Sequence, residues 1–431
     1  MAPTLHDAAI AARDPALPGL GLVLDADALA TALQCLLPTA GITGVHPTYL
    51  RYKPATSCLA GFTAVTTAGP IDLAAKAYKP WRYAFEQGRP LPAGLRSPVG
   101  PVRLGLDQSA IMIRIVPYDR ELKALPRLVD PASRRRLLGK LVPEFAAADW
   151  QQLRHKPGRR HIGLLTQDGL PRAIVKLYAP GDFPQARRGA RFAAGVGEAA
   201  LLGASTRHGI LVSAWQPGTG LAELDPDEPR TRAAVEAAAT ALAALHAERP
   251  GELLPTTLDV EAEAVRATAR SLATIVPELA ERATRVAERI AGTLLETDGR
   301  LVPLHGDFSA DQVVVQETGV RLIDWDRAAL GPAALDLGSF IARLEMAARQ
   351  AGRPRPKLLI EAFAAAYAAA TGAPPKGARL WTAAALLRLA VEPFRTRRAD
   401  WPKLTRALLD RVEQHVERAM QRPPRQRKIP A

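Results

Sequence analysis

Residues 305–312, HGDFSADQ, combine side chains that can carry out phosphoryl transfer. Gln312 follows Asp307 by five residues, and a β-branched run and a second short apolar stretch then lead to Asp324. An aspartate can accept the proton of an attacking hydroxyl, while an amide oxygen and a second carboxylate can hold Mg²⁺ on the phosphates of a nucleotide. The alternative is a hairpin stabilised by local side-chain hydrogen bonds. The spacing and the following IDWD sequence favour the reactive site.

Phosphoryl transfer also needs a cation on the phosphates. Lys176 ends the β-branched and apolar stretch AIVKLY, as the nucleotide-binding lysine of a kinase strand does, although a strand lysine that extends into solvent is the alternative. Upstream, KPGRRHIGLL provides Gly158 for close backbone approach, with Arg159 and Arg160 beside it. We expect a loop over the nucleotide phosphates here, and for the two arginines a solvated turn is an equal alternative.

The expected acidic partner of Lys176 is not obvious. Between Lys176 and Leu221 the sequence contains two acids, Asp182 and Glu198, and Glu198 follows FAAGVG, where a turn is as expected as a helix. If neither acid reaches the lysine, nucleotide binding is weak or differently arranged. A catalytically impaired kinase-like binding protein therefore stays open as an alternative.

The elements that must position these residues occur in a repeat. LRYKP matches LRHKP at an offset of 103 residues, AAKAYKP matches IVKLYAP at 100, and SAIMIRIVPYDREL matches HGILVSAWQPGTGL at 99. A helical pattern precedes each copy, at 25–37 and 131–148, and short strands follow it. The repeat predicts two small α+β lobes.

The predicted domains are an N-terminal cap at 1–130, a nucleotide-binding lobe at 131–224 and a mostly helical lobe at 225–431. Long helical patterns with acidic starts fill the third domain, interrupted by the polar hairpin of 305–326. One helical lobe can complete one nucleotide cleft. We therefore expect the second copy to bind nucleotide and the first, which lacks the Gly-Arg-Arg sequence, to be a degenerate copy.

The chain resembles the aminoglycoside phosphotransferase and choline kinase-like family. The resemblance spans about residues 145–431 and is carried by four motifs: LAALHA at 242–247, HGDFSADQ at 305–312, LIDWD at 322–326 and ALDLGSF at 334–340. It implies an α+β, protein-kinase-like two-lobe fold, here with an additional N-terminal lobe that repeats the nucleotide-binding lobe. Glutamine in place of the more frequent asparagine is similar to the maltokinase branch, which also carries an extra N-terminal region.

The resemblance assigns each motif residue a role in an ATP- and Mg²⁺-dependent kinase. The implied roles are catalytic base for Asp307, Mg²⁺ ligands for Gln312 and Asp324, phosphate contact for Lys176, and structural support of the catalytic loop for His305 and Asp336.

The composition of the chain indicates which classes of partner and acceptor to expect. The 431 residues contain 57 lysines and arginines against 43 acids, a net charge of +14. The basic residues are spread along the chain, so we expect no nucleic-acid partner, and the densest run, 418–428, reads as a non-helical, solvated end. No apolar run approaches the ~20 residues of a membrane span, and no secretory signal is evident, which predicts a cytoplasmic protein without a membrane partner.

A basic chain suits a neutral or anionic acceptor better than a polycationic aminoglycoside. We therefore predict a small-molecule acceptor, a sugar or amino sugar, with a kinase of peptide or protein hydroxyls as a further alternative. The helices after residue 340 are expected to wall the acceptor pocket, with the segment 388–402 as a candidate.

Overall fold

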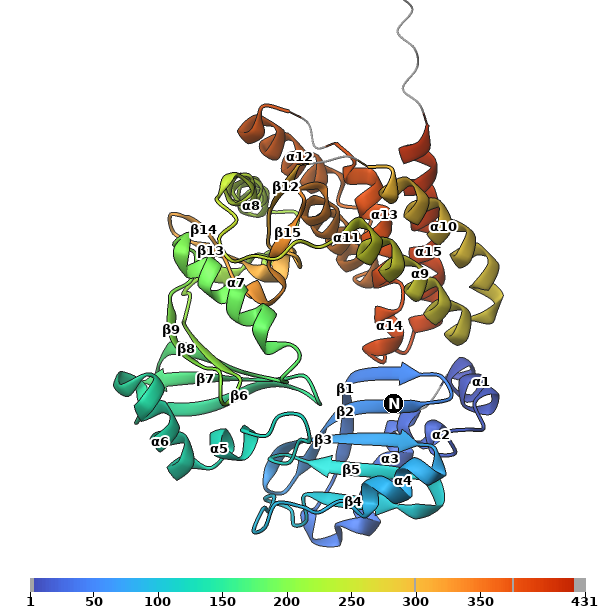
Figure 1. The fold of residues 1–431 in the computed structure, drawn as a ribbon. Coiled ribbons are helices and arrows are strands. Elements are labelled where there is room, and N and C mark those ends of the chain that lie inside the picture. Colours follow the sequence, from blue (N-terminus) through green and yellow to red (C-terminus); the bar gives the residue numbers. More distant parts are fainter. Residues whose placement is uncertain (1–3, 298–299, 374–375, 422–431) are drawn as a thin grey trace, which may run out of the picture. The chain divides into compact units, whose positions relative to one another are not determined.

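The computed structural model describes residues 4–297, 300–373 and 376–421, which form two compact units (Figure 1). The described residues of the first unit fall within Met1–Arg191, Ala200–Trp215 and Pro393–Trp401. Those of the second fall within Phe192–Ala199, Gln216–Glu392 and Pro402–Ala431. Residues 4–130 of the first predicted lobe lie in the first unit, whereas residues 192–199 and 216–224 of the second predicted lobe fall in the second unit. The predicted boundaries after residues 130 and 224 stay predictions.

Two antiparallel five-stranded sheets organise the first unit. The first sheet has the order β1-β2-β3-β5-β4, with β1 (Gly44–Lys53), β2 (Ser57–Thr66), β3 (Gly69–Tyr78), β4 (Arg103–Leu106) and β5 (Ile111–Ile115). The second has the order β6-β7-β8-β10-β9, with β6 (Asp149–Lys156), β7 (Arg160–Gln167), β8 (Leu170–Tyr178), β9 (Leu201–Ser205) and β10 (Ile210–Ala214). The shared order confirms that the N-terminal lobe repeats the second.

The strand registers of the two sheets also correspond. The lysine of each central strand pairs with equivalent neighbours: Lys76 with Leu59 and Met112, and Lys176 with Ile162 and Leu211. The lysines are 100 residues apart in the sequence, and their neighbours are 103 residues (Leu59 and Ile162) and 99 residues (Met112 and Leu211) apart, as in the sequence repeat. A β-bulge interrupts the β7–β8 pairing between Leu165 and Thr166, whereas β2 and β3 pair without interruption.

Helices precede and follow the central strands of both sheets. They are α1 (Leu5–Arg13), α2 (Leu20–Leu24), α3 (Ala26–Leu36), α4 (Pro80–Gln87), α5 (Leu125–Val129), α6 (Pro131–Leu141) and α7 (Phe183–Gly195). Asp25 caps α3, and Asp130 caps α6 by accepting a hydrogen bond from the Ser133 N–H. Leu137 and Leu138 of α6 then pack in one core with residues of β8 and β10. The two helical segments predicted ahead of the copies are confirmed, although the second ends at Leu141.

The second unit is mainly helical. Its helices are α8 (Pro229–Ala247), α9 (Leu258–Ile275), α10 (Ala280–Leu295), α11 (Ala334–Gln350), α12 (Lys357–Thr371) and α13 (Ala378–Leu389). The helices α14 (Glu392–Arg395) and α15 (Trp401–Met420) begin where the chain passes between the two units. Phe340 and Phe363 stack with their ring centroids 4.2 Å apart in its core, and Phe308 lies 5.2 Å from Phe340.

Two small sheets carry the polar hairpin of the second unit. Their strands are β11 (Thr219–Gly220), β13 (Val313–Gln316) and β14 (Gly319–Leu322) in one sheet, and β12 (Leu301–Leu304) and β15 (Ala329–Pro332) in the other. The antiparallel pair β12–β15 brackets the hairpin β13–β14 in sequence. The strands from β12 to β15 form a polar insertion between α10 and α11.

The C-terminal segment departs from its prediction. Residues 418–420, expected to be non-helical, complete α15, because the first proline lies beyond them at residue 423. Residues 422–428 of the predicted basic end lie outside the described residues. Among the helices that the structure describes, none combines the length and apolar character required to span a membrane.

Candidate active site

The loop after β12 is fixed by a buried carboxylate. Asp336, in the first turn of α11, is fully buried and accepts hydrogen bonds from the backbone N–H groups of His305 at 2.7 Å and Gly306 at 2.9 Å. Gly306 has φ +78°, and a Cβ atom there would lie 2.1 Å from the Arg327 carbonyl oxygen. Both the left-handed backbone and the close approach require glycine.

The His305 ring joins this loop to the end of β14. Its Nε2–H donates to the Ile323 carbonyl oxygen at 2.8 Å, and the ring centroid lies 4.9 Å from that of Trp325. The indole Nε1–H of Trp325 donates in turn to the Leu322 carbonyl oxygen at 3.0 Å. These contacts tie the loop of Asp307 to the segment that carries Asp324.

A chain of buried side chains continues from Asp336 to two further helices. His246 of α8 lies with Nε2 3.4 Å from Asp336 Oδ2 and with Nδ1 2.8 Å from the Tyr367 hydroxyl of α12. Burial, and then the charge of Asp336, raise the pKa of Tyr367 to about 12. The LAALHA motif contains His246, but no motif indicated Tyr367, which lies 121 residues away.

Asp307, the predicted base, is partly exposed and forms an ion pair. Arg343 Nη2 of α11 donates to Asp307 Oδ1 at 3.0 Å, with about a third of each side chain exposed. Sequence reasoning missed Arg343. The available signal was its position seven residues after Asp336, because two helical turns return a side chain to the same face of a helix.

The two predicted metal ligands lie at adjacent positions of the hairpin. The Ile323 N–H donates to the Gln312 carbonyl oxygen at 2.9 Å, so Gln312 lies opposite Ile323 across the hairpin. Asp324 is the next residue along the chain after Ile323. Asp324 adopts a left-handed conformation, with φ +62°. An amide and a carboxylate are the hard oxygen donors that suit Mg²⁺, which commonly takes few protein ligands and completes its shell with phosphate oxygens and water.

No group of three or more His, Cys, Asp or Glu side chains within residues 4–297, 300–373 and 376–421 could hold a metal ion.

The two acids considered as partners of Lys176 have other contacts. Arg159 donates to Asp182 through Nε at 3.2 Å and through Nη2 at 3.3 Å. Glu198 lies beyond the end of α7, on the turn that was expected, and accepts a hydrogen bond from the Leu322 N–H at 2.9 Å. Glu198 thus supports the strand that leads to Asp324.

The expected phosphate loop is the turn between β6 and β7. Gly158 has φ +68° there, and its N–H donates to Asp119 Oδ2 at 2.7 Å. Arg160 is the first residue of β7 and pairs with Tyr178 of β8. A phosphate contact by the Gly158 N–H would thus require displacement of the Asp119 carboxylate. Lys176 itself is half-buried near the end of β8.

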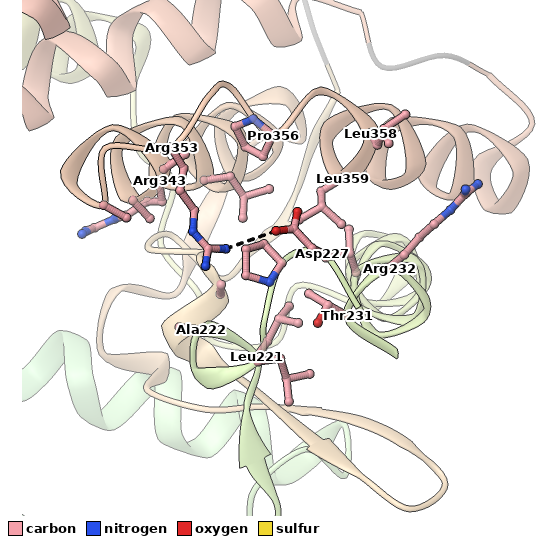
Figure 2. A pocket seen from close by; sticks show the side chains of 18 of the residues that line it. Leu221, Ala222, Asp227, Thr231, Arg232, Arg343, Arg353, Pro356, Leu358 and Leu359 are labelled. Carbon is pink, nitrogen blue, oxygen red and sulfur yellow. Dashed lines mark ion pairs between the residues drawn. The ribbon is translucent and has the colours of Figure 1, made fainter. Parts of the chain in front are cut away.

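A large pocket in the second unit is lined by Arg343, the ion-pair partner of Asp307, and by Asp311, whereas Asp307 itself does not line it. It has a volume of about 1000 Å³ and is walled by the start of α8, the end of α11 and the start of α12 (Figure 2). Arg343 lines it, so the residue paired with Asp307 also contacts the pocket space. Asp227 and Arg353 form an ion pair of 3.6 Å in the wall.

The segment 388–402, a candidate for the acceptor pocket, contributes no residue to this wall. Arg397 instead forms a buried ion pair of 2.9 Å with Asp7 and donates to the Leu24 carbonyl oxygen in the first unit. The pocket wall comes from residues 343–359, after residue 340, and from 221–235 and 310–311 before it. The prediction that helices after residue 340 wall the acceptor site stays a prediction.

A comparison with known protein families covers each residue predicted for the site except Gly158. The profile of a family described as "Phosphotransferase enzyme family" matches residues 159–387, more than half of the chain, including Lys176 and the motifs from 305 to 340. No curated protein sequence matches the chain.

Solved structures are similar in fold at low sequence identity. Choline kinase from Cryptosporidium parvum Iowa II is 12% identical with a TM-score of 0.50, over 67% of this chain and 96% of that one. A choline/ethanolamine kinase family protein from Mesorhizobium loti is 14% identical with a TM-score of 0.49, over 67% and 95%. An aminoglycoside phosphotransferase from Streptomyces rimosus is 18% identical with a TM-score of 0.45, over 59% and 96%. The first of these confirms the kinase-like fold.

Proposed function

Because the chain belongs to the phosphotransferase enzyme family, we propose that it transfers the γ-phosphoryl group of ATP to a hydroxyl of a small molecule, a sugar or amino sugar, with Mg²⁺ as cofactor. The observation that carries this proposal is the geometry around Asp307. The buried Asp336 holds the Asp307 loop by accepting two backbone hydrogen bonds, and the Asp307 carboxylate is paired with Arg343, which lines a pocket. A group that must be positioned for proton transfer needs this rigidity.

In the proposed reaction Asp307 accepts the proton of the acceptor hydroxyl. The oxygen of that hydroxyl bonds to the γ-phosphorus as the bond between this phosphorus and the departing ADP oxygen breaks. Oδ1 of Asp307 is bound to Arg343, whereas Oδ2 accepts no hydrogen bond from another described residue. The arrangement supports Oδ2 as the proton acceptor and Arg343 as the residue that orients the carboxylate.

The nucleotide end of the reaction is assigned to six further residues. Gln312 and Asp324 would hold Mg²⁺, which when bound neutralises phosphate charge. Lys176 would contact the phosphates, and Arg159 and Arg160 stay a weaker proposal because Arg159 is paired with Asp182. The same holds for Gly158, whose N–H is engaged by Asp119.

The acceptor assignment is supported by the chemistry of the pocket. Its wall mixes cationic and acidic side chains with apolar ones, and the charged members include Arg232, Arg353, Asp227 and Glu228. A polyhydroxylated, weakly charged molecule can hydrogen-bond to such a wall, whereas a polycation would meet several arginines. The likeness to the maltokinase branch stays a prediction.

The deciding experiment measures ADP formation. The full chain is incubated with Mg²⁺-ATP and a panel of sugars, amino sugars, aminoglycosides and Ser/Thr peptides. Acceptor-stimulated ADP should disappear in Asp307→Asn and persist in Glu317→Gln, an exposed carboxylate in the turn of the same hairpin. Stimulation by peptides alone would replace the proposed acceptor class. ATP binding without turnover across the panel would contradict catalysis and support an impaired kinase-like binding protein.

A further inference from the structure

One face of the first sheet collects basic side chains around Lys76. In the ladder, Arg51 pairs with Leu59, which pairs with Lys76, so these side chains share a face. Tyr78 lies two residues further along β3 on that face, and Arg114 pairs with Ala74 of the same strand. Because side chains alternate along a strand, Arg114 also points to this face.

A single carboxylate from α4 organises the arginines of this face. Glu86 is 2% exposed and lies 2.7 Å from Arg120 and 3.3 Å from Arg114. Arg82 reaches the same carboxylate at 2.8 Å and Arg89 approaches it at 3.8 Å. Four guanidinium groups thus converge on one negative charge. Arg120 also approaches a second acid, Glu121, at 3.6 Å, on the exposed side.

Lys76 stands beside this cluster without an acidic partner of its own. It is half-buried, makes no ion pair with another described residue, and its Nζ lies 4.6 Å from the centre of the Tyr78 ring. Burial, and then the charges of Arg114 and Arg51, lower the pKa of Lys76 to about 8. An ammonium held between arginines is unfavourable unless a negative group accompanies it.

Arg114 carries a second unsatisfied group. Its Nη2 donates to the Tyr78 hydroxyl at 3.0 Å and to Glu86 at 3.3 Å, but its Nε has no hydrogen-bond partner among the described residues. The Arg114 residue is 8% exposed. A buried guanidinium N–H without an acceptor is costly, so a ligand that supplies oxygen atoms would relieve it.

The second sheet retains only part of this cluster: Arg154 stands at the position of Arg51 and shares its face with Lys176. At the offset of the repeat, Arg114 corresponds to Ser213 and Arg120 corresponds to Thr219. The offset of 100 that relates the two lysines places Ala186 at the position of Glu86. What distinguishes the first copy is therefore Arg114, Arg120 and the carboxylate of Glu86 that holds them, beside a lysine and an arginine that both copies share.

We propose that this face of the first sheet binds a phosphate group of a small molecule, with Lys76, Arg51 and Arg114 as its ligands. Glu86 is the positioning residue that holds Arg114 and Arg120 in place. Guanidinium forks and an ammonium point charge together suit the three terminal oxygens and the double charge of a phosphate group. The proposal concerns the first copy and does not depend on the phosphotransferase activity.

The test follows the chemical reactivity of Lys76 in the full chain. Lysines are acetylated with acetic anhydride at about pH 8, where a lysine with this lowered pKa reacts readily, and the rate at each site is read by mass spectrometry. Inorganic phosphate, ADP and glucose 6-phosphate are compared with sodium chloride at matched ionic strength. Lys140, an exposed residue of α6, is the internal control. Because the measured quantity is the acetylation rate of Lys76, ADP bound at the proposed nucleotide site of the second copy does not affect the interpretation.

Phosphate-containing ligands should slow the acetylation of Lys76 and leave Lys140 unchanged, and the ligand that protects best identifies the carrier of the phosphate group. In Arg51→Met and Arg114→Met the affinity for the protecting ligand should fall at least about tenfold, because each loses a charge-assisted contact. Thermal unfolding reports whether Arg114→Met still folds. If Arg114→Met does not fold, the affinity measured in Arg51→Met decides the test. Protection no greater than with chloride, equal slowing at Lys140, or unchanged affinity in Arg51→Met would overturn the proposal.

Discussion

Arg343, in the third turn of α11, and Asp307, in the loop that follows β12, form an ion pair of 3.0 Å. The contact engages Oδ1 of Asp307, whereas Oδ2 accepts no hydrogen bond from another described residue. Both residues are partly exposed, so the pair contributes little to folding and its expected role is to position the base.

Replacement of Arg343 should therefore affect turnover more than stability. We expect Arg343→Met to lower kcat by about ten- to a hundredfold, since a misplaced base reduces the fraction of productive encounters, and Arg343→Lys to recover part of the loss. Arg349→Met, an exposed arginine later on the same helix, is the matched control. Steady-state kinetics and thermal unfolding on all three variants make the comparison. An unchanged kcat in Arg343→Met would remove Arg343 from the site.

Lys176 should be required for turnover. Loss of its charge in Lys176→Met removes a cation from the phosphates, and we expect kcat/KM for ATP to fall by about a hundredfold or more. Lys140→Met, an exposed change in the same unit, should retain activity. Turnover close to that of the unmodified protein in Lys176→Met would show that another cation serves the nucleotide.

Asp336→Asn should destabilise the second unit. The carboxylate accepts two backbone hydrogen bonds with its two oxygens, whereas the asparagine amide offers one oxygen and places an NH₂ group against the other N–H. We expect the free energy of unfolding to fall by about 1–3 kcal/mol. Asp410→Asn, which breaks a half-exposed pair with Arg282, should cost less than about 1 kcal/mol. Urea unfolding measures both, and equal losses would show that the buried carboxylate is not special.

Acid should weaken the protein through a buried cluster in the second unit. Glu345 is 7% exposed and binds Arg411 at 2.7 and 2.9 Å, Arg355 at 2.7 Å and His415 at 3.2 Å. Although burial alone would raise it, the hydrogen bonds from Arg411 and His415 hold the pKa of Glu345 well below its ordinary value. Burial lowers the pKa of His415 from 6.5.

Both shifts act in the same direction. A depressed carboxylate pKa gives stability that is present above the unfolded value of 4.5 and is lost as the pH falls below it. A depressed histidine pKa means that the unfolded chain binds a proton first, so stability also falls as the pH drops below 6.5. We expect the free energy of unfolding in urea to decrease from neutral pH through this acid range.

Glu345→Gln tests the assignment. It leaves Arg411 buried without its partner charge, so it should cost about 3 kcal/mol or more at neutral pH. The variant should also lose less stability than the parent protein on acidification, since one titrating group is gone. A parallel pH dependence in both proteins would place the acid sensitivity elsewhere.

Features set by residues that lie close together in the sequence could be predicted from it. The repeat was visible because strand register preserves residue offsets, and the loop of Asp307 because its reactive residues fall within one hairpin. Arg343 and Tyr367 were not predictable in their roles, since their contacts with Asp307 and His246 depend on how helices pack. The engagement of Gly158 by Asp119 was hidden for the same reason.

The bulge between Leu165 and Thr166 explains how the two sheets tolerate different lengths. The offset between the copies falls from 103 residues in β7 to 100 in β8, so the second hairpin is three residues shorter than the first. Because side chains alternate between faces, the loss of an odd number of residues from a regular hairpin would place the side chains of one strand on the opposite face of the sheet. Arg172 is left without a partner in the ladder at the bulge and absorbs the odd residue. The chain could thus be shortened at the hairpin tip while Lys176 kept the orientation that Lys76 has in the longer copy.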